Sequence, residues 1–406
     1  MDRIFFHIDV NSAFLSWSAI YRLRQGDTVD LRTVPSIVGG DREKRHGIVL
    51  AKSIPAKKYG IETAEPIVNA FRKCPTLINV EANHEFYREM SHALMDYLRT
   101  VSPDIEQASV DECYMDFTPV SHMYESPKAC ADMIRAEVYA RFGFTVNVGI
   151  SDRKVLAKMA SDFSKPDKTH TLYCSEIREK MWPLPIGDLF LCGKSAVVTF
   201  KKLGIETIGD LACFDRNVIN SNLKSHGDLL WRFANGIDDS AVVTEPPETK
   251  GVGNSTTVDH DVTDRDEAVR VLGILSESVA GRLKKHGFRT SLVTVEIKYA
   301  TFKSVSRQKM LRDPVCTAKS IHEAAISLFD DLWNKDPIRL LGIRTSKLTD
   351  ESEPVQLSLF DTFEDGGATV EPHDTEKQKK LEEALASIKE KYGRDAVVKG
   401  TNLRSP

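Results

Sequence analysis

The sequence predicts a multidomain protein of the α+β class. Its 406 residues are enough for two to four domains, and an apolar fraction of 41% with a charged fraction of 28% is ordinary for a globular chain. Over residues 4–163, short apolar runs typical of buried strands alternate with amphipathic helical patterns. Pro246-Pro247 then separates this region from a last compact unit that has a helix and strand of its own.

Strands and helices are assigned from the period of the apolar residues. Strands are expected at 4–8, 112–117 and 144–150, and helices at about 83–101, 126–142 and 152–163. Residues 19–79 interrupt this pattern with Gly39-Gly40 and a basic stretch from Arg42 to Lys58, so we expect a small inserted subdomain there.

The region after Lys165-Pro166 contains two glycine-punctuated short helices, around 191–195 and 203–211. Helix–hairpin–helix patterns of this kind can offer backbone N–H groups to a DNA phosphate, and an ordinary helical hairpin is the alternative. Within 250–348, a helix at about 264–286 precedes an alternating strand at 293–299 and a polar, basic stretch. A helix-backed sheet with a basic, hydroxyl-rich face suits sequence-independent contact with DNA.

Charge and cysteine usage narrow the class of protein. Residues 281–350 hold 14 Lys and Arg against 7 Asp and Glu, although the whole chain carries −4. Such a block indicates a segment that meets a polyanion, and a solvated basic face is the alternative. The sequence shows neither a membrane-length apolar run nor a secretory signal pattern, and none of its seven cysteines are spaced CxxC. We therefore expect a cytoplasmic protein with reduced thiols, no zinc site and no membrane contact.

Three carboxylates form the candidate catalytic set. Asp9 follows the first expected strand, and Asp111 and Glu112 lie at the start of the second. If these strands pair, the carboxylates converge at one sheet edge, where they would repel unless cations bind. Oxygen ligands suit Mg²⁺, and two ions about 3.5–4 Å apart serve in-line phosphoryl transfer. An isolated Asp-Glu pair is more often plain surface charge, so the hypothesis depends on the surrounding motifs.

Three motifs, in order, resemble those of the Y-family, or translesion, DNA polymerases, with the bacterial polymerase IV type nearest. They are Ile8–Phe14, the SxDE stretch Ser109–Asp116, and Val155–Pro166 with its LAK and KP elements. The resemblance runs to about residue 348 and implies a right-hand fold. Its parts would be a palm at 1–18 and 80–170, fingers at 19–79, a thumb at 171–238, a linker at 239–249 and a little finger at 250–348.

The resemblance implies a template-directed DNA polymerase that acts on primer–template DNA and dNTPs, with low-fidelity translesion synthesis in DNA repair. Asp9, Asp111 and Glu112 would hold two Mg²⁺ ions, with Mn²⁺ as an alternative and with help from the carbonyl of Val10. The enzyme is expected to be a monomer.

The nucleotide site is also implied by the resemblance. Phe14 resembles the steric gate that excludes a 2′-OH, and a simple core aromatic is the alternative. Lys165 resembles the palm lysine that reaches the triphosphate, and a solvated lysine is the alternative. The family usually has Tyr-x-x-Arg in the fingers, where this chain has Ile54–Lys57. Lys57 can neutralise phosphate, but it cannot form the bidentate fork of arginine.

DNA contacts are expected at Gly193 and Lys194 in the thumb and at Arg307 and Lys309 in the little finger. Leu191 departs from the pattern, because the hairpin loop often has its first glycine at this position.

The tail at 349–406 is acidic and is expected to be flexible apart from a charged helix at about 374–392. Its stretch 356–360 resembles the QLxLF motif by which bacterial polymerases dock on the sliding clamp. Gln356 would offer its amide to a polar notch of the clamp. Apolar pockets of the clamp would be filled by Leu357, Leu359 and Phe360. Folding of this stretch back onto the little finger is the alternative.

Two other functions stay open. A non-catalytic translesion accessory protein could share the scaffold, although the complete carboxylate set argues against it and Lys57 argues weakly for it. Another palm-type two-metal enzyme, such as a nucleotide cyclase, would leave the basic block without a purpose.

Overall fold

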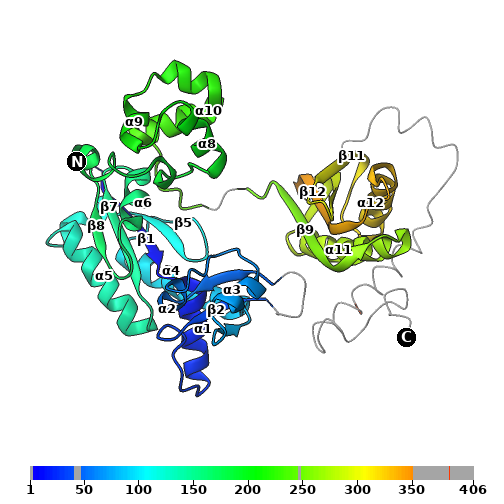
Figure 1. Cartoon of the computed structure of the whole chain (residues 1–406), viewed down its shortest axis with the longest axis horizontal. Coiled ribbons are helices and arrows are strands. Elements are labelled where there is room, and N and C mark those ends of the chain that lie inside the picture. The colour runs from blue at the N-terminus through cyan, green and yellow to red at the C-terminus, as the bar shows by residue number, and fades with distance from the viewer. Residues whose placement is uncertain (1–2, 41–46, 246–247, 351–383, 385–406) are drawn as a thin grey trace. The chain divides into compact units, whose positions relative to one another are not determined.

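The computed structural model describes residues 3–40, 47–245 and 248–350 and the single residue 384. The chain divides into two compact units, Met1–Pro247 and Glu248–Pro406, each described here by itself (Figure 1). The division falls inside the segment expected to be a linker. None of the helices in the described part of the chain is long and apolar enough to cross a membrane.

The first unit is built on a five-stranded sheet with the strand order β5-β6-β1-β7-β8. Its central strand β1 runs antiparallel to both neighbours, β6 and β7, and β8 is parallel to β7. The predicted pairing of the first two strands is therefore confirmed. The strands are β1 (Phe5–Val10), β5 (Ile105–Gln107), β6 (Glu112–Asp116), β7 (Val146–Ser151) and β8 (Thr169–Thr171).

Alternation along β1 separates a core face from a polar face. Phe6, Ile8 and Val10 pack into the main core together with apolar residues of three helices: α1 (Ala13–Arg24), α4 (His84–Val101) and α5 (Pro127–Phe142). On the opposite face of the sheet lies α6 (Lys154–Asp162). A Cβ at Gly149 of β7 would lie 2.0 Å from the Ala157 carbonyl oxygen, so α6 packs directly on the sheet backbone.

The helices begin where the sequence supplies caps. Asn83 accepts a hydrogen bond from the Phe86 N–H at the start of α4. Ser126 caps α5, which ends at Gly143 with a φ of 79°. The three expected helices of this region are present, with ends within two residues of those predicted.

The inserted subdomain has a three-stranded sheet of order β3-β2-β4 and a small apolar core of its own. Its elements are β2 (Ser36–Gly39), β3 (Val49–Lys52), α2 (Ile54–Lys57), α3 (Ile67–Lys73) and β4 (Ile78–Val80). The predicted boundary between residues 18 and 19 falls inside α1, which continues to Arg24, so the insertion begins only after that helix. Residues 42–46 of the predicted basic stretch lie outside the described residues.

The last part of the first unit is helical and has a separate apolar core. Its helices are α7 (Ile177–Lys180), α8 (Lys194–Lys202), α9 (Ile208–Cys213) and α10 (Arg216–Ala234). Inside α10, Lys224 has a φ of 53°, so two helices meet there at a kink. Short 3₁₀ turns in this unit span Thr118–Met123, Cys174–Glu176 and Ile186–Asp188.

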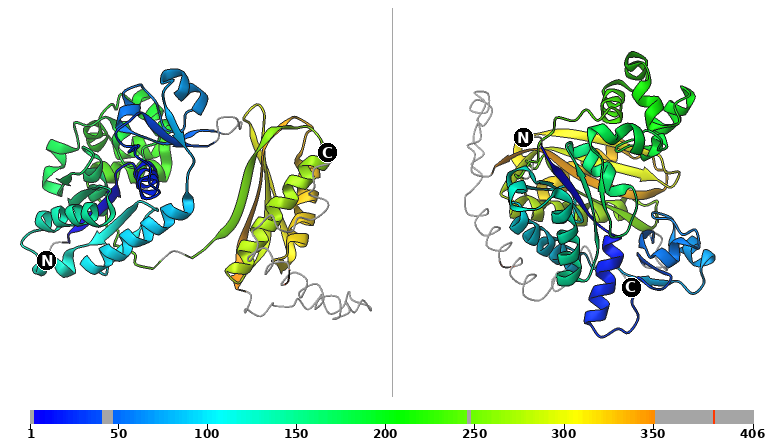
Figure 2. Two further views of the ribbon diagram at one scale, coloured as in Figure 1. Left: turned by 90° about the horizontal axis from the view of Figure 1, so that it is seen from below. Right: turned by 90° about the vertical axis from the view of Figure 1, so that its left-hand side faces the viewer.

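The second unit is an antiparallel four-stranded sheet of order β11-β10-β12-β9 with two helices on one face (Figures 1 and 2). The predicted helix at 264–286 and strand at 293–299 are both present. The elements are β9 (Gly251–Val262), α11 (Arg265–Lys285), β10 (Phe288–Tyr299), β11 (Ser304–Val315), α12 (Ala318–Leu332) and β12 (Ile338–Asp350). The docking residues of 356–360 lie outside the described residues, and so does all of the predicted helix at 374–392 except residue 384.

Candidate active site

One hollow in the first unit is lined by every residue predicted to hold metal or nucleotide. These residues come from four separate stretches of the sequence, and the structure brings all of them to the same place. They are Asp9, Val10, Phe14, Lys57, Asp111, Glu112 and Lys165.

Strand pairing places the three carboxylates. Asp9 lies opposite Glu112 in the β1–β6 register, so their side chains project from the same face of the sheet. Asp111 precedes β6, and its carbonyl accepts the Val10 N–H at 3.0 Å. The Ser109 hydroxyl donates to the Asp111 carboxylate at 2.5 Å and accepts the Glu112 N–H at 3.1 Å. This turn lets two adjacent acidic residues line one hollow, which a continuous strand would not allow.

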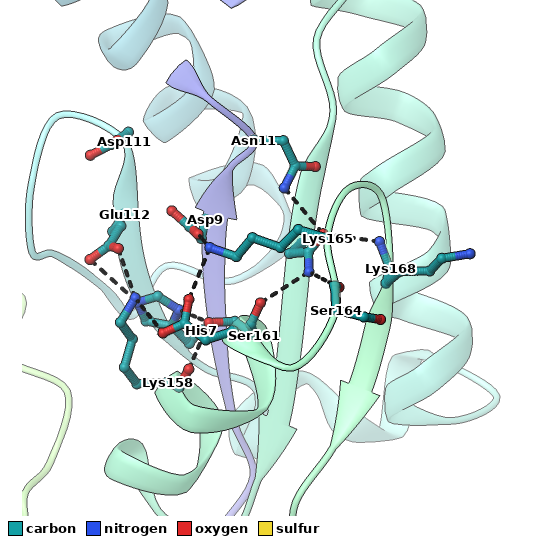
Figure 3. A network of polar contacts seen from close by, with 12 residues as sticks. His7, Asp9, Asn11, Asp111, Glu112, Lys158, Ser161, Ser164, Lys165 and Lys168 are labelled. Atoms are coloured by element: carbon teal, nitrogen blue, oxygen red, sulfur yellow. Dashed lines mark hydrogen bonds and ion pairs between the residues drawn. The ribbon is translucent and has the colours of Figure 1, made fainter. Parts of the chain in front are cut away.

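Two lysines form ion pairs with the carboxylates of Asp9 and Glu112 (Figure 3). The Lys165 ammonium donates hydrogen bonds to Asp9 and, at 2.9 Å, to Asp162. The Lys158 ammonium donates to Glu112 at 2.8 Å and lies 3.3 Å from Asp162. Burial raises the pKa of Asp9 to about 6, against the opposing effect of the Lys165 charge.

His7 was missed by the sequence reasoning, although it lies on the same face of β1 as Asp9. The Ser161 hydroxyl donates to the Lys158 carbonyl at 2.8 Å, so it can only accept the hydrogen bond from His7 Nδ1 at 2.8 Å. Burial, with the Lys158 and Lys165 charges, holds the pKa of His7 well below its usual value. His7 is therefore neutral, and its Nε2 lies 3.8 Å from Glu112, a distance too long for a hydrogen bond.

The donor set fits a divalent cation. Within the described ranges, no cluster of three or more His, Cys, Asp or Glu side chains has the arrangement of a metal site. The hollow nevertheless offers three carboxylates and the Val10 carbonyl, all oxygen ligands of the kind that Mg²⁺ and Mn²⁺ prefer. Two of these carboxylates already have a cationic partner, which shows that this pocket stabilises positive charge.

Phe14 belongs both to the hollow and to the core. Its ring stacks on Tyr87 with centroids 4.8 Å apart and meets His84 edge-on at 5.9 Å. The ring also lines the hollow near Asp9. The two interpretations made from the sequence, steric gate and core aromatic, are thus compatible in one residue.

Comparison with known proteins decides the family. Residues 8–162 match the impB/mucB/samB family, and residues 249–359 match its C-terminal domain. The DNA polymerase IV of Clostridium acetobutylicum is 42% identical over 99% of both chains. The chain belongs to the DNA polymerase IV group of the Y family. The DNA polymerase IV 1 of Bacillus subtilis is 34% identical over 99% of this chain and 94% of its own length.

The fold agrees with this family. The solved structure of a Y-family DNA polymerase chimera, Dbh-Dpo4(243-245)-Dbh, matches with a TM-score of 0.73. The match covers 86% of this chain and 99% of that one, at 20% sequence identity, and it supports the fold alone.

The fingers depart from the usual pattern of Y-family polymerases. Ser53 caps the short helix α2 by accepting the Ala56 N–H at 3.0 Å. Ile54, which stands where the family has tyrosine, is 57% exposed and borders the hollow. Lys57 ends α2 and also borders the hollow. The hollow therefore presents an apolar side chain and a point charge in place of a hydroxyl and a guanidinium fork.

In the thumb, the N-terminus of α8 is the better candidate for phosphate contact. Gly193 is its N-cap and supplies no side-chain cap, so Lys194 and the first N–H groups are available. The N-terminus of α9 is closed by a capping box between Thr207 and Asp210. Leu191, in the position that often holds glycine, has a φ of 65° and is 50% exposed.

The strand register shows on which side of the sheet Arg307 and Lys309 lie. In the β10–β11 register they lie opposite Val295 and Val293, whose side chains are buried beneath the helices. They therefore project on the helix side at the sheet edge, and Arg307 donates to the Asp331 carbonyl at 3.4 Å. The sequence predicted a basic, hydroxyl-rich face on a helix-backed sheet, but the strand register decides which residues share a face.

The open face of this sheet has different residues. Its shallow hollow is lined mostly by small and polar side chains, with one carboxylate, Glu296, and one guanidinium, that of Arg344, which lies opposite Thr294. Gly253 and Gly342 keep the face flat, because a Cβ at either position would press on a neighbouring strand at 3.1 Å. A polyanion backbone could approach such a face closely.

Proposed function

We propose that this chain adds nucleotides to a DNA primer at the hollow lined by Asp9, Asp111 and Glu112. The chain is a template-directed DNA polymerase of the translesion type, and catalysis in its family depends on divalent metal ions. The observation that carries the assignment of the site is that residues from four separate stretches, each predicted to bind metal or nucleotide, line one hollow.

The proposed ions are two Mg²⁺, with Mn²⁺ as an alternative. They would activate the primer hydroxyl and neutralise the leaving pyrophosphate. Asp9 and Glu112, fixed opposite each other on β1 and β6, would supply oxygen ligands from a rigid sheet. Asp111 and the Val10 carbonyl would complete the set at the strand ends.

The other residues of the hollow would bind the incoming nucleotide. Lys57 from the fingers and Lys165 from the palm would neutralise the triphosphate. Phe14, held by its stacking on Tyr87, would fill the space beside C2′ of the sugar and exclude a 2′-OH. Ile54 would add only apolar contact, so the geometry of triphosphate binding should differ from that of family members with tyrosine and arginine.

DNA would be held by dispersed contacts in both units. We assign Gly193 and Lys194 to a backbone phosphate and the open face with Arg344 to the duplex, with Arg307 and Lys309 adding charge at the sheet edge. Residues 349–406 would carry the predicted sliding-clamp motif. The proposed enzyme acts as a cytoplasmic monomer that is tethered by the clamp.

Primer extension by the purified full-length chain tests the function. With a labelled primer–template, dNTPs and Mg²⁺, the primer should lengthen according to the template, and a chelator should stop the reaction. DNA binding without extension would favour the accessory protein. Conversion of a nucleoside triphosphate to a cyclic monophosphate, with no DNA requirement, would favour the cyclase.

A further inference from the structure

The Asp9 carboxylate is paired with an ammonium group inside the hollow. Its side chain is only 7% exposed, and Lys165 reaches across to it from the loop that follows α6 (Figure 3). The ammonium donates a second hydrogen bond to Asp162 at 2.9 Å. An ammonium seated on a carboxylate oxygen takes the place that a divalent cation would need there, because the two positive charges repel at contact distance.

The two lysines of the site differ in their freedom to leave. Lys158 lies within α6, and its side chain is only 9% exposed. Its backbone carbonyl accepts a hydrogen bond from the Ser161 hydroxyl. Lys165 lies on a loop, is 37% exposed and borders the same hollow as Lys57. The flexible stem of a lysine lets its ammonium shift by several ångströms without movement of the backbone. Lys165 is thus the lysine that can exchange partners.

On the basis of the proposed function, we propose that Lys165 and a divalent cation compete for Asp9, and that nucleotide binding ends the competition by drawing Lys165 onto the triphosphate. The free enzyme then binds the ion at Asp9 weakly. The nucleotide removes the competing ammonium and brings negative charge into the hollow, so ion and nucleotide bind cooperatively. By linkage, the ion must also tighten nucleotide binding by the same factor.

The exchange has a consequence for the order of binding. Without nucleotide, Asp9 and Glu112 are each neutralised by a lysine, and the site has little need of an external cation. With nucleotide, Lys165 serves the triphosphate and Asp9 is released to the ion. The catalytic arrangement of charges would therefore assemble only when a nucleotide is present, which limits unproductive metal occupancy.

The test is Mn²⁺ binding to the full-length protein, measured by electron paramagnetic resonance with and without dNTP. The variant is Lys165→Met, which keeps much of the side-chain volume and removes the charge. Without nucleotide it should bind Mn²⁺ at least about fivefold more tightly than the wild type. The tightening caused by dNTP should shrink, and Lys165→Arg, which keeps the charge, should behave like the wild type.

Lys154→Met is the matched control. Lys154 is also a lysine of α6 with a side chain 9% exposed, and it donates to a carboxylate, that of Glu106, at 2.6 Å. It does not line the hollow. This variant should leave Mn²⁺ affinity within about twofold of the wild type, because its charge lies outside the metal ligands. Lys165→Gln, with its fold checked by circular dichroism, repeats the test with a polar side chain.

Two failures can be told apart. If the wild type extends primers but Lys165→Met and Lys165→Gln bind Mn²⁺ no more tightly without nucleotide, the competition is wrong and the polymerase site stands. Equal tightening in Lys154→Met would also overturn the competition, since the effect would then be one of general charge. If the wild type does not extend primers at all, the proposed function itself fails.

Discussion

Phe14 shows how one side chain can serve both packing and selection. Its stacking on Tyr87 fixes the ring, and a fixed ring can exclude a substituent that a mobile one would admit. The sequence could place Phe14 after the first strand, but it could not show that the ring borders the hollow. That depends on how α1 packs against the inserted subdomain that follows it, a tertiary contact that the local sequence does not show.

We predict that Phe14→Ala raises the ratio of ribonucleotide to deoxyribonucleotide incorporation by about 10- to 100-fold, because space opens beside C2′. The ratio of kcat/KM for rNTP and dNTP, measured on one primer–template, is the readout. A loss of stability alone lowers both rates and leaves their ratio unchanged. An unchanged ratio would return Phe14 to the interpretation of a core aromatic.

At the same scale, His7 and Lys158 explain why part of the site could not be predicted. Three carboxylates and the flanking motifs are visible in the sequence because they are rare together and follow clear strand patterns. His7 reads as one more residue of an apolar strand, and Lys158 reads as a charged residue of an amphipathic helix. Their roles arise from the packing of α6 on the sheet, where both become buried beside Glu112.

At the scale of elements, the contact of α6 with β7 positions the site. Gly149 makes this contact possible, since a Cβ there would meet the Ala157 carbonyl at 2.0 Å and the Ser161 N–H at 2.5 Å. These are backbone atoms, which cannot rotate away as the end of a side chain can. The helix would have to shift, and Lys158 would move with it.

We predict that Gly149→Ala destabilises the chain by about 1–3 kcal/mol or more and lowers extension activity at temperatures where it stays folded. Thermal unfolding and primer extension measure the two effects. Gly187→Ala is the control, because its Cβ would only reach ordinary contact with Val197 at 3.5 Å. Equal melting temperatures for the two variants would contradict the proposed close packing.

The register of the second unit gives a prediction about DNA binding. Arg344→Glu on the open face should weaken binding to all sequences alike and lower the salt slope by about 1. The double change Arg307→Glu and Lys309→Glu at the edge should weaken binding less for each charge reversed. Fluorescence anisotropy with duplexes of different sequence at several salt concentrations measures both. A larger effect per charge at the edge would show that the open face is not the main DNA-binding face.

Boundaries were harder to predict than elements for a physical reason. The end of an apolar strand or of a glycine-capped helix can be predicted from the residues at that end, as for the helix at 264–286. A domain boundary depends on which residues pack together, so α1 could cross the expected position between residues 18 and 19 without a local signal. The face on which Arg307 lies could not be predicted for a similar reason, because a register is set by the neighbouring strand.

At the scale of the whole molecule, the tail is expected to tether the enzyme to the sliding clamp. Leu359→Ala with Phe360→Ala should abolish stimulation by clamp-loaded DNA, because the apolar docking groups are removed. Extension in the absence of the clamp should stay unchanged, and Ser358→Ala, within the same stretch, should keep full stimulation. Equal loss with and without the clamp would show that the stretch is structural.

The central claim is that Asp9, Asp111 and Glu112 act in the chemical step and not in DNA binding. Single-turnover extension by Asp111→Ala, with primer–template affinity measured on the same preparation, tests it most directly. The control is Asp96→Ala, which removes an exposed carboxylate paired only on the surface with Arg99. We predict that Asp111→Ala loses extension by at least about 10³-fold, while DNA affinity and the control stay near wild type. Extension by Asp111→Ala at the wild-type rate would contradict the account.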